Sequence, residues 1–116
     1  MKKCAFFLSI ILMVLCFISC LPNSGVFSFN NDTAEIIETA SVSICHQTFT
    51  FKDVKPRSTI TQSYKITGDS SFEVSIKTAS GKTTAAADGY VTNGMDFQHN
   101  IIFTDQSVKI IDMTKH

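Results

Sequence analysis

From residue 34 onward, large apolar residues and small polar residues alternate along the chain with a period of two. The clearest run places Phe72, Val74 and Ile76 on one side of the chain and Glu73 and Ser75 on the other. Successive side chains of a strand point to opposite faces of a sheet, so this period predicts strands that bury one face. No long segment outside the N-terminal region has the 3.6-residue period of a helix.

Turn signals separate the alternating segments at intervals that are typical of a small all-β domain. These signals are Lys55-Pro56-Arg57-Ser58, Gly68-Asp69-Ser70-Ser71, Ser80-Gly81-Lys82, Asn93-Gly94 and Asp105-Gln106-Ser107. The pattern predicts an antiparallel, immunoglobulin-like β-sandwich of about seven strands. A small β-barrel is the alternative fold. Asn93-Gly94 predicts a hairpin between the strands on either side of it, because both residues tolerate positive φ.

The predicted core takes one apolar face from each segment. It consists of Phe49, Phe51, Tyr64, Ile66, Phe72, Val74, Ile76, Tyr90, Ile101, Phe103, Val108 and Ile110. Cys45 and His46 are placed next to each other on a strand, with Cys45 as a small buried hydrophobe. His99 is interpreted as a solvated residue at a loop edge.

The first residues have the composition of a secretory signal. Lys2 and Lys3 precede an apolar run over 4–18 that only Ser9 interrupts. About 20 apolar residues are needed to span a bilayer, so this run of about 15 favours a removable signal over a retained anchor.

The end of this run, Phe17-Ile18-Ser19-Cys20, resembles the lipobox of bacterial lipoproteins. In that family the signal is cut before the cysteine, whose sulfur carries a diacylglycerol. The resemblance implies that Cys20 is acylated and attaches the protein to a membrane of the cell envelope. Because Leu21 is not Asp, it also implies the periplasmic face of the outer membrane if the cell is Gram-negative.

Three regions follow from these patterns. Residues 1–19 are the signal, and 34–116 are the β-sandwich domain. Residues 20–33 are expected to be a lipidated flexible tether because Pro, Asn, Ser and Gly dominate them. Phe27 and Phe29 leave open whether this segment instead adds a strand.

Charge and cysteine content narrow the classes of partner. Without Lys2 and Lys3, eight basic residues face ten acidic ones, and no basic stripe marks a nucleic-acid partner. After signal removal and acylation of Cys20, Cys45 remains as the single thiol, so no disulfide within the chain is expected.

The sequence carries no recognisable catalytic or metal-binding constellation. His46, His99 and His116 lack the spacing of a zinc site. No nucleophile elbow, phosphate-binding loop or calcium loop is present. We therefore expect a protein without cofactors that is not an enzyme.

One segment, DGYVTNGMDF over 88–97, combines aromatic residues, glycines and an amide around a predicted turn, as partner-binding loops often do. Its candidate contact residues are Tyr90, Thr92, Asn93, Met95 and Phe97. The interpretation in which these residues serve packing and turn formation stays open beside it.

The sequence favours a lipid-anchored β-sandwich that binds another envelope protein or a glycan. One alternative is an inhibitor of a lysozyme-like hydrolase, because Ser80-Gly81-Lys82 resembles the serine-glycine-basic loop of lipoprotein lysozyme inhibitors. A second alternative is a hydrolase in which His46 or His99 meets a carboxylate and a hydroxyl only in the folded chain. The oligomeric state is left open.

Overall fold

The structure is a computed structural model that describes residues 23–105 and 107–114. Its eight strands are β1 (Ser24–Asn31), β2 (Ile37–Ile44), β3 (Gln47–Val54), β4 (Thr59–Lys65), β5 (Ser70–Thr78), β6 (Thr83–Val91), β7 (Phe97–Phe103) and β8 (Val108–Asp112). The signal run, Cys20 and His116 lie outside the described residues. No helix among the described residues has the length and hydropathy needed to cross a membrane.

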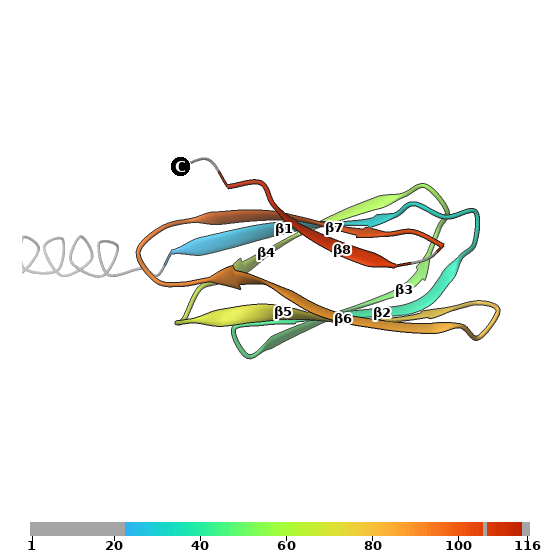
Figure 1. The fold of residues 1–116 in the computed structure, drawn as a ribbon, viewed down its shortest axis with the longest axis horizontal. Coiled ribbons are helices and arrows are strands. Elements are labelled where there is room, and N and C mark those ends of the chain that lie inside the picture. The colour runs from blue at the N-terminus through green and yellow to red at the C-terminus, as the bar shows by residue number, and fades with distance from the viewer. Residues whose placement is uncertain (1–22, 106, 115–116) are drawn as a thin grey trace, which may run out of the picture.

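The strands form two four-stranded sheets that lie face to face (Figure 1). Sheet A has the order β4-β1-β7-β8, and sheet B has the order β3-β2-β5-β6. The predicted all-β sandwich is therefore confirmed, and the sheets do not join into one closed barrel. β2 and β3 pair within sheet B, whereas in the immunoglobulin order the second and third strands lie in different sheets.

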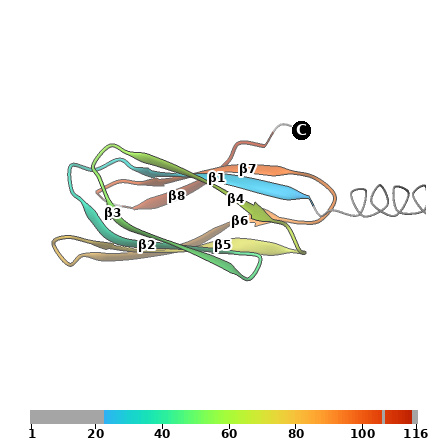
Figure 2. The same ribbon diagram turned by 180° about the vertical axis from the view of Figure 1, so that it is seen from behind.

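Most neighbouring strands are antiparallel, but β1 and β7 run parallel in the middle of sheet A. Their register pairs Gly25 with Phe97 and Phe27 with His99, residues more than 70 positions apart in sequence. The view from behind shows β1 lying between β4 and β7 (Figure 2). β1 is thus a central strand of the domain.

This position corrects the predicted domain boundary. Residues 24–31, which the sequence placed in a flexible tether, form β1, whose Phe27 and Phe29 are fully buried. The tether was expected because small polar residues dominate the segment, but the alternation of Phe27, Phe29 and Asn31 towards the interior makes it a strand.

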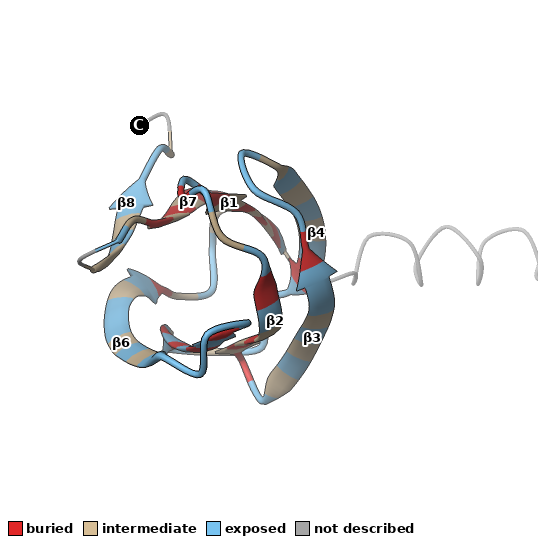
Figure 3. Ribbon diagram, turned by 90° about the vertical axis from the view of Figure 1, so that its right-hand side faces the viewer, coloured by how far each residue is buried: buried red, intermediate tan, exposed pale blue. Residues whose placement is uncertain are grey.

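The core lies between the two sheets, and strands of both sheets carry buried residues (Figure 3). The alternation in β5 is confirmed, since Phe72, Val74 and Ile76 are all buried. Of the other predicted core residues, Tyr64, Ile66, Ile101 and Phe103 are buried, and Phe49, Phe51, Val108 and Ile110 pack partly buried against them. Tyr90 is the exception, because 59% of its surface is exposed.

One turn prediction and one strand prediction are wrong. Asn93-Gly94 does not close a hairpin, because β6 and β7 belong to different sheets. Cys45 and His46 do not lie on a strand but form the two-residue turn of the β2–β3 hairpin, with φ angles of 49° and 60°. Positive φ at both central residues is the geometry that matches the twist of a hairpin. Cys45 is nevertheless buried, as expected, and it is a free cysteine.

The corner between the two sheets is held by Asn31, which is 1% exposed. Its amide nitrogen donates to the carbonyl oxygens of Glu35 at 2.9 Å, Val54 at 3.1 Å and Lys55 at 3.1 Å. Its side-chain oxygen accepts hydrogen bonds from the amide and the hydroxyl of Thr33. One buried side chain thereby satisfies backbone groups of two crossovers.

Candidate partner-binding surface

The segment 88–97, which the sequence marked as a candidate partner-binding loop, includes the connection 92–96, and this connection crosses from β6 in sheet B to β7 in sheet A. It is fastened to the start of β1. The Asp96 carboxylate accepts a hydrogen bond from the Ser24 amide at 3.0 Å, and the Gly94 amide donates to the Asn23 side chain at 3.2 Å. The Thr92 hydroxyl donates to Asp69 on the neighbouring β4–β5 connection at 2.5 Å. The loop is therefore tied down on both sides.

These contacts divide the five candidate residues of the loop. Phe97 is buried and stacks on the ring of His99, with 6.1 Å between centroids, and Met95 packs against the core. Thr92 is half-buried and bonded to Asp69. Tyr90 and Asn93 are exposed. Two of the five candidates can thus meet a partner without rearrangement.

A β-bulge at Gly89 explains why Tyr90 faces solvent. The pairing of β5 with β6 shifts here, so that Ser71 pairs with Tyr90 while Phe72 pairs with Asp88. Gly89 has a φ of 74°, and a Cβ at this position would lie 2.9 Å from Ile110 Cγ2. The extra residue changes the side to which the strand presents its next side chain, so Tyr90 points away from the core.

Tyr90 therefore extends the outer face of sheet B, where a shallow depression of about 460 Å³ is lined mainly by serine and alanine side chains and by Glu73. We call this surface the hydroxyl face. It consists of Ser41, Ser43, Glu73, Ser75, Ala85 and Ala87, with Tyr90 at one end. Cross-strand pairing places Ser41 beside Ser75 and Ser75 beside Ala85, so the three strands form one continuous surface.

The hydroxyl face was not predicted from the sequence as a site. Its signal was present in the alternation of Ser41, Ser43, Glu73 and Ser75 with buried residues, which fixes the outward direction of each side chain. The sequence did not say which strands are neighbours. The pairing of β2 with β5 and of β5 with β6 brings these positions together.

His99 is not the solvated residue that the sequence suggested, because it is completely buried on β7. Its ring packs edge-on against Phe72, with centroids 4.9 Å apart, and neither ring nitrogen has a hydrogen-bond partner among the described residues. Burial lowers the pKa of His99, and the charge of Asp112 partly offsets this effect. His99 therefore favours the neutral imidazole.

Tyr64 is a second buried polar side chain in the same aromatic cluster. Within the part of the chain that the structure describes, its hydroxyl has no hydrogen-bond partner, and its ring packs edge-on against Phe72 with centroids 5.8 Å apart. Burial raises the pKa of Tyr64 well above its ordinary value, with smaller contributions from Cys45 and Asp112. These groups lie in the packed interior and are separate from the hydroxyl face.

The remaining candidate positions are spread over the surface. His46 is exposed at the β2–β3 turn. Within 23–105 and 107–114, His, Cys, Asp and Glu residues form no group of three that could hold a metal ion. Ser80, Gly81 and Lys82 are exposed at the tip of the β5–β6 hairpin, at the opposite end of the sandwich from the start of β1 (Figure 1). The Ser80 amide donates to the Glu35 carboxylate at 2.8 Å, and hydrogen bonds from Ser80 lower the pKa of Glu35.

Comparison with known proteins gives information on the fold alone. No family model matches this chain, and no curated protein matches its sequence. Among solved structures, the NMR structure of a protein from Eubacterium rectale is similar, with a TM-score of 0.57. The match covers 81% of this chain and 92% of that chain at 15% sequence identity.

Proposed function

We propose that this protein is a lipid-anchored envelope protein that binds another protein through the hydroxyl face and has no catalytic activity of its own. The observation that carries the anchoring part is the lipobox-like stretch Phe17-Ile18-Ser19-Cys20. Asn23 lies three residues after Cys20, and three residues of extended chain span at most about 10 Å. An acylated Cys20 would therefore hold the sandwich close to the bilayer.

Contacts around Asn23 would transmit this attachment to both sheets. The Asn23 carbonyl accepts a hydrogen bond from the Ile66 amide at 2.9 Å, and its side chain bonds Gly94 and Asp96. The anchored end would then carry the 92–96 loop, and the Ser80-Gly81-Lys82 tip would point away from the membrane.

The chemistry of the hydroxyl face supports recognition of a protein. Serine hydroxyls, one carboxylate and an exposed tyrosine at its end are the kinds of groups that antibody paratopes use for adaptable hydrogen bonding around an aromatic anchor. Sugar rings are commonly held by stacking on aromatic surfaces, and Tyr90 is the one aromatic side chain of this face. A glycan partner is therefore the second possibility.

A photo-cross-linking amino acid at position 75 of the full chain, expressed in cells, tests this proposal. Thr61 on the outer face of sheet A is the matched control, since it is also an exposed hydroxyl residue at the middle of a strand. We expect a discrete protein adduct from position 75, no adduct from position 61, and loss of the adduct when Tyr90→Ala is added. Equal labelling from both positions, or none, would argue against the hydroxyl face.

The exposed tip at Ser80-Gly81-Lys82 favours one further candidate, a lysozyme inhibitor, because a soluble enzyme could reach this end of an anchored protein. Inhibition of lysozyme by the full chain, abolished by Lys82→Ala, would favour this function. Unchanged lysozyme activity at micromolar protein would remove it.

A further inference from the structure

Strand β6 is the edge of sheet B and has an unpaired side. It is nine residues long, and its stretch Thr83–Ala87 contains neither a charged residue nor a proline. An edge strand of this kind exposes backbone donors and acceptors to any strand that can approach. Its small side chains leave the outer face open, and β8 lies beside its inner face.

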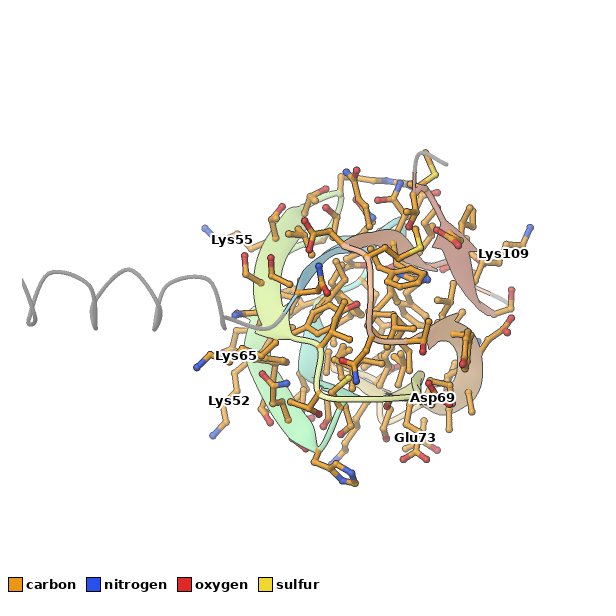
Figure 4. The ribbon with its side chains drawn as sticks, turned by 90° about the vertical axis from the view of Figure 1, so that its left-hand side faces the viewer. Lys52, Lys55, Lys65, Asp69, Glu73 and Lys109 are labelled. Atoms are coloured by element: carbon orange, nitrogen blue, oxygen red, sulfur yellow. The ribbon has the colours of Figure 1, made fainter. Side chains whose placement is uncertain are left out.

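The other three edges carry features that discourage pairing. On β3, Lys52 is charged and Asp53 has a φ of 53°, which bends the strand. On β4, the amide and the carbonyl of Lys65 are both bonded to the Gln47 side chain, at 3.2 and 2.7 Å. β8 is only five residues long and includes Lys109. Figure 4 shows Lys52, Lys55 and Lys65 together along the β3–β4 side.

The hairpin contacts determine which backbone groups of β6 face outward. The Thr78 amide donates to the Lys82 carbonyl at 2.9 Å, so the backbone groups of Lys82 point toward β5. In an antiparallel pair this direction alternates from residue to residue. Thr83, Ala85 and Ala87 therefore turn their N–H and C=O groups away from β5, toward the open side.

We propose that this protein forms a two-fold symmetric dimer in which β6 pairs antiparallel with β6 of a second copy, centred on Ala85. In this register Ala85 faces Ala85 of the second copy, and Thr83 faces Ala87. Each of these pairs can exchange two backbone hydrogen bonds, because the outward groups belong to these residues. The inference does not depend on the proposed function.

Charge complementarity favours a second copy of this chain as the pairing strand, and it favours the register centred on Ala85. The same two-fold axis places Lys82 opposite Asp88 of the second copy, so the dimer contains two such pairs. Both residues are exposed. The Lys82 ammonium contacts the Asp105 carbonyl, which leaves it further hydrogens, and Asp88 uses Oδ1 for the Gly89 amide, which leaves Oδ2. Shifting the centre by one residue in either direction removes these pairs.

Space on both faces of β6 accommodates side chains of the second strand, which itself lies beside the edge of β6. The depression of the hydroxyl face borders β6 on the outside at Ala85 and Ala87. A groove of about 560 Å³ borders it on the inner side, between Ala86 and Ile110 of β8. Figure 3 shows β6 and β8 along the same side of the sandwich. Inward-pointing Thr84 and Ala86 of the second copy are small enough to lie beside this groove.

Sedimentation of the full chain in detergent across the micromolar range measures the association. We expect a dimer that Lys82→Asp and Asp88→Lys each weaken by about tenfold, since each change puts like charges opposite each other twice. The variant with both substitutions should regain wild-type association, because it exchanges the two charges across the axis. Ala85→Pro should abolish the dimer by removing a central donor.

The matched control is Lys52→Asp, the same charge change on β3 at the opposite edge of sheet B, which should leave association unchanged. Circular dichroism of each variant confirms that it is folded. A folded monomer at every concentration overturns the proposal. A dimer that survives each of Lys82→Asp, Asp88→Lys and Ala85→Pro also overturns it. So does a double variant that associates no better than either charge variant alone.

Discussion

The ring of Tyr64 on β4 lies directly against the backbone of Gly25 on β1. A Cβ on Gly25 would come within 2.1 Å of Tyr64 Cζ, far inside any real carbon contact. The two residues pair across the strands, so the aromatic ring covers the glycine of its neighbour. Tyr64 thereby reaches Phe27 and Phe72 in the core.

This contact predicts that Gly25→Ala destabilises the domain by about 2 kcal/mol, because the added methyl group forces the Tyr64 ring out of its place. Urea unfolding followed by circular dichroism measures the change. Ser24→Ala on the same strand is the control and should have little effect. In a double-mutant cycle, Tyr64→Leu should relieve part of the penalty. Additive effects of the two substitutions would show that the contact is not the cause.

Asn31 offers a test of the buried corner. Asn31→Leu should lower the free energy of unfolding by about 3 kcal/mol, since the carbonyls of Glu35, Val54 and Lys55 lose a donor in a buried setting. The matched change Asn93→Leu, at an exposed amide, should stay within about 0.5 kcal/mol of wild type. Similar losses from both variants would contradict the role of Asn31.

The buried imidazole of His99 predicts acid sensitivity. Because burial lowers its pKa in the folded state, the unfolded chain binds a proton first as the pH falls. The contribution of His99 to the free energy of unfolding should therefore be constant above about pH 6.5. Below that pH it should decrease, by at most about 1.4 kcal/mol per pH unit. The neighbouring charge of Asp112 reduces this slope.

Unfolding measured between about pH 5 and pH 7 tests the assignment, with His99→Phe as the comparison. Phenylalanine retains the packing against Phe72 and Phe97 and removes the titrating group. Its stability should change much less over this interval. Identical pH profiles for the two proteins would assign the sensitivity to other groups.

Tyr90 and Phe72 should respond differently to truncation although both are aromatic residues in strands. Phe72→Ala should cost about 4 kcal/mol, because Phe72 is fully buried. Tyr90→Ala should change stability by less than about 0.5 kcal/mol and should lower partner capture instead. A large loss of stability from Tyr90→Ala would show that this side chain packs in the core and would contradict its exposure.

The directions of individual side chains were largely predictable, because the two-residue period fixes them locally. Phe72, Val74 and Ile76 point inward as expected. The same rule failed at Tyr90, since the bulge at Gly89 adds one residue to the strand and reverses the alternation. The local sequence pattern did not indicate this effect of Gly89 on the next side chain.

Pairing between distant segments was not predictable from local patterns. Asn93-Gly94 has a strong hairpin preference, yet the chain there crosses to the other sheet, while Cys45-His46 adopts the hairpin turn with two residues that rarely take positive φ. Because β1 pairs in parallel with β7, part of the segment that was expected to be a tether is a central strand. The hydroxyl face depends on such pairing, so it too emerged only from the folded chain.

Mass spectrometry of the protein isolated from cell envelopes tests the central claim most directly. We predict a chain that begins at Cys20 and carries the mass of a diacylglycerol with further acyl chain, and a Cys20→Ser variant that lacks this mass and leaves the membrane fraction. A chain that retains residues 1–19 with an unmodified Cys20 would contradict the account.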